Sequence, residues 1–236
     1  MAKDYFDFQQ FRVYHDKCAM KVGTDGVLLG AWGSIGDARR VLDVGTGSGL
    51  IALMVAQRSP EARIDAIDVE ESAVQQATEN ARISPFADRI VVKHADVREY
   101  ECTEAYDAVF CNPPYYPEDT LPPDTGRALA RNSALLPFSE LVKAVSRLMA
   151  PKGVFSACLP MQAIDSFVTE CLVHDLYPFR QCNVQTVARK QPKRVLVSFS
   201  FDRTLPLEIT SIILQEGDKK SEAYLDLARG FYLEAE

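Results

Sequence analysis

Residues 41–49 read Val-Leu-Asp-Val-Gly-Thr-Gly-Ser-Gly and lead into the apolar run Leu-Ile-Ala-Leu-Met-Val-Ala-Gln at 50–57. A hydrophobic strand, a glycine-rich turn and a helix in this order bring a ligand close to backbone amides at a helix N-terminus. The dinucleotide fingerprint Gly-x-Gly-x-x-Gly/Ala requires a small residue at position 50, where this chain has Leu50. The loop therefore disfavours a nicotinamide cofactor, and its ligand-binding residues are predicted to be Gly45, Gly47 and Gly49.

Acidic residues follow the strands predicted around this loop. Asp43 lies two residues before the first glycine and suits a ligand that carries positive charge. Asp68 closes the strand-like stretch 63–67, where a carboxylate can accept hydrogen bonds from both hydroxyls of a ribose. Asp96 ends the next such stretch, 89–95, and can accept from the amino group of adenine. Each aspartate can instead cap a helix or turn, but their common register favours one shared site.

A second motif follows the apolar stretch 106–111, where residues 112–116 read Asn-Pro-Pro-Tyr-Tyr. The side-chain oxygen of Asn112 and the carbonyl of Pro113 are two acceptors that can converge on a planar amino group. Pro114 restricts Pro113, and Tyr115 offers a flat face on which a nucleobase or amide can stack. The alternative interpretation is a plain proline-rich turn with tyrosines covering a core. The neighbouring motifs favour an active site.

Strand-like and helix-like stretches alternate along the chain, which predicts one α/β domain with a doubly wound, mostly parallel sheet. Thr24 or Asp25 is predicted to cap a helix over 26–32. Further helices are expected at 70–81, 137–150 and 161–173, a strand at 153–159, a hairpin from 179–186 and 195–201, and an extra strand at 207–214 before a helix or turn within 221–233.

The composition is that of an ordinary globular protein, with 236 residues, 47% hydrophobic and 25% charged. The six cysteines form no C-x-x-C pair or zinc spacing, and His15 and His94 lack metal-ligand companions, so no metal site is expected. The N-terminus has no apolar signal region and no run approaches the roughly 18 to 20 apolar residues that span a bilayer. We therefore expect reduced thiols, a cytoplasmic location and no membrane segment.

Taken together, these motifs resemble class I S-adenosylmethionine-dependent methyltransferases that methylate amino groups. Flanking stretches at 11–13, 21–32, 192–196, 224–227 and 231–233 resemble the bacterial tRNA(Val) adenine-37 N6-methyltransferases. The resemblance implies a Rossmann-like, seven-stranded sheet, S-adenosylmethionine as cofactor, and methylation of N6 of the adenosine just 3′ of the anticodon. It also implies an N-terminal lid or substrate region at 1–38, a catalytic core at 39–204 and a C-terminal extension at 205–236.

Within this resemblance, the helix at 26–32 lies over the cofactor as a lid, although it can equally cover a sheet edge. Asn112 counts among the cofactor-binding residues as well as the catalytic ones, and the protein is expected to be a monomer or weak homodimer. The sequence departs from the family pattern in two places: a second tyrosine, Tyr116, follows the motif, and the stretch at 117–126 is acidic and proline-rich. The whole loop 117–131 is expected to become ordered when substrate binds.

The net charge of −7 argues against binding nucleic acid by bulk electrostatics, so local positive charge must hold the tRNA anticodon stem-loop. A solvated face is the alternative for each such residue. The stretch 189–194 is favoured because it falls in the loop of the predicted hairpin. The RNA-binding candidates are Arg127, Arg131, Arg189, Lys190, Lys193 and Arg194.

Other functions also fit the motif. A glutamine side-chain amide suits the same pair of acceptors, which makes a protein-glutamine N5-methyltransferase the nearest enzymatic alternative. Such enzymes generally carry a helical recognition domain before the glycine loop, and about 40 residues leave little room for one. Adenine or guanine amino groups of ribosomal RNA are further possible targets, and a non-catalytic RNA-binding module is the remaining alternative.

Overall fold

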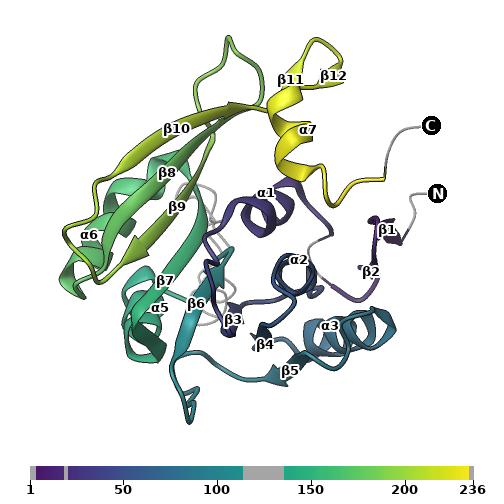
Figure 1. Cartoon of the computed structure of the whole chain (residues 1–236), viewed down its shortest axis with the longest axis vertical. Coiled ribbons are helices and arrows are strands. Elements are labelled where there is room, and N and C mark those ends of the chain that lie inside the picture. Colours follow the sequence, from purple (N-terminus) through teal and green to yellow (C-terminus); the bar gives the residue numbers. More distant parts are fainter. Residues whose placement is uncertain (1–3, 19–20, 114–135, 234–236) are drawn as a thin grey trace, which may run out of the picture.

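The computed structural model describes residues 4–18, 21–113 and 136–233. An eight-stranded sheet crosses the molecule in the order β10-β8-β9-β7-β6-β3-β4-β5 (Figure 1). Its strands are β3 (Arg40–Val44), β4 (Arg63–Asp68), β5 (Ile90–His94), β6 (Tyr106–Cys111), β7 (Met149–Pro160), β8 (Tyr177–Gln185), β9 (Arg194–Ser200) and β10 (Glu208–Ile213).

Most of this sheet is parallel. Strand β3 lies between β4 and β6, and parallel pairing continues outward to β5 on one side and β7 on the other. Strand β9 runs antiparallel to both β7 and β8, which gives the predicted hairpin. The doubly wound, mostly parallel fold is confirmed. The extra strand expected at 207–214 is β10, which pairs parallel to β8 and brings the predicted seven strands to eight.

Helices cover both faces of the sheet (Figure 1). One face carries α1 (Thr24–Trp32), α2 (Leu50–Arg58) and α3 (Glu71–Ile83), and the other carries α5 (Phe138–Leu148), the 3-10 turn η2 (Met161–Ala163) and α6 (Ile164–Val173). Each side has its own apolar core, one built around α1 and α2 and one around α5 and α6. The chain from β5 to β6, residues 95–105, contains no helix, and Val97 of this stretch belongs to the apolar core of the second face.

Helix α1 lies on the first face rather than at a sheet edge, where it packs against α2, α7, β7 and β9. Two glycines allow the close approach to α2. A Cβ at Gly26 would lie 3.0 Å from a side-chain carbon of Leu50, and one at Gly30 would lie 2.6 Å from the sulfur of Met54. A larger residue at either position would therefore require the Leu50 or Met54 side chain to move, and Gly30 is the tighter of the two because the Cβ of Met54 also lies 3.0 Å away.

Both ends of α1 are stabilised by arginines from elsewhere. The prediction that Thr24 or Asp25 caps the helix is wrong, because α1 begins at Thr24 after Gly23 and has no side-chain cap. Asp25 instead accepts a hydrogen bond from Nε of Arg194, 2.8 Å away. At the other end, Arg58 donates to the carbonyls of Gly30 and Gly33, and Arg180 donates to that of Trp32. Positive charge at a helix C-terminus complements its dipole.

The two terminal regions lie side by side (Figure 1). The N-terminal region forms the ribbon of β1 (Tyr5–Asp7) and β2 (Arg12–Tyr14), and the C-terminal region forms the hairpin of β11 (Gln215–Glu216) and β12 (Lys219–Lys220) followed by α7 (Glu222–Ala228). Phe8 makes an isolated β-bridge with Tyr232, and the amide of Gln9 donates to the carbonyl of Phe231 at 2.8 Å. The predicted C-terminal helix or turn is therefore α7, packed on α1 and β10.

All six cysteines are among the described residues, and each is a free thiol. Within residues 4–18, 21–113 and 136–233, no helix is long and apolar enough to cross a membrane.

Candidate active site

The carboxyl ends of three adjacent strands meet at one level of the sheet. Val44 of β3 pairs with Ile67 of β4 and with Cys111 of β6. The residues that follow these three positions therefore leave the sheet side by side, and they are Gly45, Asp68 and Asn112. Asn112 is half-buried and Pro113 is buried. In open α/β sheets this edge is where ligands bind.

The glycine loop has the backbone shape that a close ligand requires. Gly45, Gly47 and Gly49 have φ values of 68°, 55° and 81°, a region that other residues adopt only at a cost. A Cβ at Gly45 or Gly47 would meet nothing within 4 Å, whereas one at Gly49 would meet Ala77 of α3 at 3.3 Å. The first two glycines thus face open space, and the third allows α3 to pack against the loop.

Asp43 is fully buried beside this loop, with 1% of its surface exposed. Its Oδ2 accepts from the hydroxyl of Thr46 at 2.6 Å and from the amide of Ala52, in the first turn of α2, at 3.2 Å. Its Oδ1 has no partner in the described part of the chain. Burial raises the pKa of Asp43 to about 7, although the two hydrogen bonds oppose that shift. Helix capping therefore explains one oxygen of Asp43 and leaves the other open.

Asp68 stands at the tip of β4. Its Oδ2 accepts from the amide of Gly47 at 2.8 Å and its Oδ1 from the amide of Glu70 at 3.0 Å. Asp68 therefore fixes the glycine loop through Gly47, and each oxygen retains a lone pair for a further donor.

Asp96 lines a cavity of about 570 Å³ next to Asp68. Nε of Arg98 donates to both of its carboxylate oxygens, at 3.0 and 2.9 Å, and this pairing lowers the pKa of Asp96. The sequence analysis missed this arginine, although the Asp-x-Arg spacing carries the signal. The cavity is lined by Val69, His94, Ala95, Asp96, Glu99, Tyr100 and Glu101.

Two buried amides on α3 hold the N-terminal segment against the glycine loop, and both were missed by the sequence analysis. Asn80 accepts from the amide of Tyr14 and donates to the carbonyls of Tyr14 and Ser48, at 2.9, 2.8 and 2.8 Å. Gln76 accepts from the amide of Lys17 at 2.9 Å. Both amides are fully buried four residues apart, and such polar residues on an otherwise alanine-lined helix face are the signal that sequence offers.

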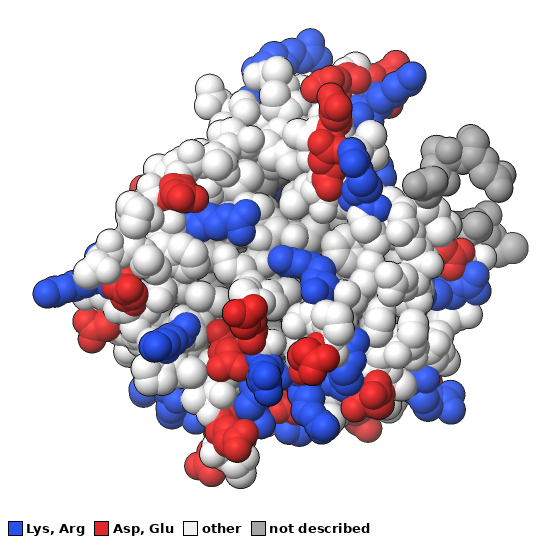
Figure 2. Space-filling model, viewed as in Figure 1, with Lys and Arg blue, Asp and Glu red and all other residues white. Residues whose placement is uncertain are grey.

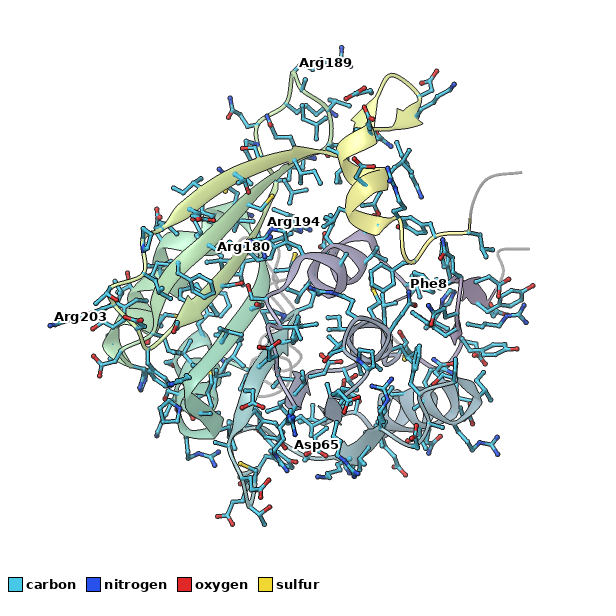
Figure 3. The ribbon with its side chains drawn as sticks, viewed as in Figure 1. Phe8, Asp65, Arg180, Arg189, Arg194 and Arg203 are labelled. Atoms are coloured by element: carbon cyan, nitrogen blue, oxygen red, sulfur yellow. The ribbon has the colours of Figure 1, made fainter. Side chains whose placement is uncertain are left out.

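The basic residues of the β8–β9 loop divide into two groups (Figure 3). Arg189, Lys190 and Lys193 are exposed, and none forms an ion pair with another described residue. Arg194 is half-buried at the start of β9 and pairs with Asp25. Because Arg194 lies opposite Pro160, the last residue of β7, this loop begins at the same edge of the sheet as Asn112.

Figure 2 shows basic and acidic side chains interspersed over one face of the molecule, without a single basic field. Several predicted site residues lie outside the described residues: Pro114, Tyr115, Arg127, Arg131 and the loop 117–131. In the described ranges, no group of three or more His, Cys, Asp or Glu side chains gathers where a metal ion could bind.

Comparison with known proteins assigns the chain to a family. The model of the methyltransferase small domain matches residues 24–136. A relative in Bacteroides thetaiotaomicron, described as tRNA1(Val) (adenine(37)-N6)-methyltransferase, is 43% identical over 99% of each chain. Another in Bacteroides fragilis, with the same description, is 44% identical over 99% of each chain.

The chain belongs to the tRNA1(Val) (adenine(37)-N6)-methyltransferase family.

Solved structures give the fold of this tRNA1(Val) (adenine(37)-N6)-methyltransferase family member. A predicted O-methyltransferase of Agrobacterium tumefaciens aligns with a TM-score of 0.68 at 20% identity, over 88% of this chain and 96% of its own. The expectation of a class I methyltransferase fold is confirmed. Full-length similarity also distinguishes the family from the glutamine-methylating alternative, which rested on the Asn-Pro-Pro-Tyr motif alone.

Proposed function

We propose that this chain transfers a methyl group from S-adenosylmethionine to N6 of adenosine 37 in tRNA(Val). The observation that carries the proposal is the meeting of Gly45, Asp68 and Asn112 at one sheet edge, in a chain that matches this family over its full length. The relatives are tRNA methyltransferases by description, and the activity on this chain is the inference drawn from them.

The residues around the glycine loop fit the proposed cofactor. S-adenosylmethionine carries positive charge, and the unpartnered Oδ1 of Asp43 is a buried acceptor that such a ligand would satisfy. The open space at Gly45 and Gly47 admits a ligand against the backbone. Asp68 has free lone pairs for ribose hydroxyls, and Asp96 lines a cavity beside it that suits adenine.

When bound, the cofactor supplies a methyl group already activated on a sulfonium, so no strong base is needed. Asn112 and Pro113 would accept hydrogen bonds from both hydrogens of the adenine amine. This orients the amine toward the methyl group and stabilises the positive charge that develops on nitrogen. Pro114 would stiffen the loop and Tyr115 would stack on the base.

The RNA would be held by the exposed positive charges of the β8–β9 loop, together with Arg127 and Arg131. Arg194 serves the fold as well, because it pairs with Asp25 of α1. The informative double variant is therefore Lys190→Glu with Lys193→Glu, which leaves that pair intact. It should weaken tRNA binding and reduce the slope of log affinity against log salt by about two. An unchanged slope would mean that these lysines do not contact phosphates.

Nucleoside mass spectrometry tests the proposed function. The purified chain is incubated with S-adenosylmethionine and unmodified tRNA(Val) transcript, which is then digested and sequenced by mass. We expect N6-methyladenosine at position 37, and no product on a transcript with guanosine there. Parallel reactions with ribosomal RNA and with a release factor cover the alternatives. If ribosomal RNA or the release factor is methylated and tRNA(Val) is not, that substrate would replace tRNA(Val) in the proposal.

A further inference from the structure

A second cavity, of about 360 Å³, lies where the two terminal regions meet, away from the glycine loop. Its walls are largely aromatic. Phe6 is 37% exposed, and its ring centroid lies 4.8 Å from that of Phe8 and 5.9 Å from that of Tyr232. The lining residues are Tyr5, Phe6, Asp7, Lys220, Tyr232 and Leu233. A cavity with exposed ring faces suits a flat ligand.

The charge beside these rings is positive and available. Nζ of Lys220 stands 3.5 Å above the ring of Tyr232, and no carboxylate of the described chain forms an ion pair with it. The carboxylate of Asp7, which also lines the cavity, is already paired with Arg12. Partial burial lowers the pKa of Lys220, which is the cost of holding a cation there without an anion. An anionic group would remove that cost.

This cavity is connected to the active site by a short path of hydrogen bonds. Tyr5, in its wall, pairs with Tyr14 across the β1–β2 ribbon. The backbone of Tyr14 bonds to Asn80, which in turn bonds to Ser48 of the glycine loop. The cavity therefore lies against the same N-terminal ribbon that Asn80 holds beside the glycine loop.

We propose that this cavity is a second RNA-binding site, which takes an unstacked base of the tRNA substrate other than the target adenosine. The base stacks on the exposed ring of Phe6, and its phosphate contacts Lys220, which lies over the neighbouring ring of Tyr232. A nucleotide is the ligand that combines a flat ring with an anion, and aromatic stacking with a nearby cation is how proteins hold single-stranded nucleotides. The inference rests on the proposed function, since it supposes that RNA is the substrate.

Steady-state kinetics on the tRNA(Val) transcript tests the site with two variants and a control. Lys220→Gln removes the cation and should raise KM for tRNA about 5- to 10-fold, with the salt slope reduced by about one. Phe6→Ala removes the exposed ring and should raise KM about 10-fold. Both should leave kcat and cofactor affinity within twofold. Lys219→Gln, a neighbour in the same strand that does not line the cavity, is the control and should leave KM unchanged.

Ultraviolet crosslinking of the wild-type complex adds an independent measurement. RNA should be attached to peptides that contain residues 5–14 or 220–233. The inference is overturned if neither variant raises KM, or if Lys219→Gln raises it as much as Lys220→Gln, which would indicate only diffuse charge. If wild type methylates no tRNA, the proposed function fails first. In that case the binding of the tRNA(Val) transcript to the wild type and to the two variants would be compared by gel shift. Equal binding by all three would reject this site as well.

Discussion

Two aspartates on adjacent strands of the sheet have opposite environments. Asp43 of β3 lies against α2, with one oxygen hydrogen-bonded and the other without a partner in the described chain. Asp65 of β4, labelled in Figure 3, lies one register step away and near Tyr100 of the helix-free connection between β5 and β6. It accepts from the hydroxyl of Tyr106 at 2.6 Å and from Nζ of Lys93 at 3.0 Å.

The difference separates a structural group from a functional one. Asp65 sits in a closed network in which Tyr100 also bonds to Tyr106 and Lys93, and both oxygens of Asp65 have partners, Oδ2 in Tyr106 and Oδ1 in Lys93. Asp43 carries a desolvation cost that the protein alone does not relieve, as its raised pKa shows. Unrelieved cost of this kind concentrates at binding sites, because the ligand supplies the missing partner. Substitutions at the open edge should therefore change function, and those in the closed network should change stability.

The largest effect is expected at the open edge from Asn112→Ala. Losing one preorganised polar group typically costs about 10² to 10³ in turnover, so kcat should fall several hundred-fold. Cofactor affinity should stay within a few-fold and the melting temperature should be unchanged, because Asn112 follows the strand rather than packing inside it. Calorimetry with S-adenosylmethionine checks this separation. Joint loss of activity and cofactor binding would make Asn112 a cofactor residue only.

Asp43→Asn should come next. Asparagine keeps an acceptor toward Thr46 and Ala52 but replaces the open oxygen with an NH2 group, so cofactor Kd should rise about 10- to 100-fold. Affinity should also depend on pH. A cationic ligand favours ionised Asp43, and with a free-state pKa of about 7 binding below that pH must release a proton. Affinity of the wild type should therefore rise from pH 5.5 to 7 and then level off, whereas the variant should show no such rise.

The raised pKa of Asp43 affects folding stability in the opposite direction to cofactor affinity as pH rises. Because the folded pKa of Asp43 exceeds its ordinary value of 3.8, the folded state binds more protons than the unfolded state between about pH 4 and 7. The stability contribution is full below pH 4 and is lost as pH rises toward 7. The proton released by Asp43 when the cofactor binds below pH 7 can be measured by titration calorimetry in two buffers of different ionisation enthalpy. Equal binding heats in both buffers would contradict that release.

Asp65→Ala should act on stability alone. It removes the acceptor of the Tyr106 hydroxyl, so the free energy of unfolding should fall by about 1 to 2 kcal/mol, as judged by urea denaturation. Tyr106→Phe removes the donor from the same bond, and the two changes should be less than additive. Cofactor Kd should not move. A change in Kd comparable to that of Asp43→Asn would abolish the distinction between the two aspartates.

The sequence was sufficient for the parts of this molecule that local pattern controls. Strand and helix positions followed from apolar periodicity, and the carboxyl edge followed from the position of Gly45, Asp68 and Asn112 after their strands. It was not sufficient for long-range pairing. Asp25 was predicted as a helix cap because its local neighbours allow that role, but Arg194, 169 residues away, takes its carboxylate.

The same limit applies to the groups that support the site. The hold of Asn80 on Tyr14 and Ser48 depends on a fold that brings α3 beside the N-terminal ribbon. The Asp65 network includes Tyr100 from the helix-free connection between β5 and β6, and its Asp and Lys residues are of types found mostly on protein surfaces. Only the register of β4 against β5 brings Asp65 close to Lys93, and pairing register is a property of the assembled sheet.

The smallest effect should come from Lys93→Gln, at the rim of the closed network. Burial acts to lower the pKa of Lys93, but hydrogen bonds to Tyr100 and Asp65 outweigh it and raise that pKa. The Lys93 side chain is still 42% exposed, so solvent screens the ion pair and its contribution should be below about 1 kcal/mol. The loss should shrink further in 1 M salt, as denaturation at two salt concentrations would reveal. A loss as large as that of Asp65→Ala at both salt concentrations would instead mean that the Lys93–Asp65 ion pair is shielded from solvent, and Asp65 would then resemble Asp43 in needing a cation.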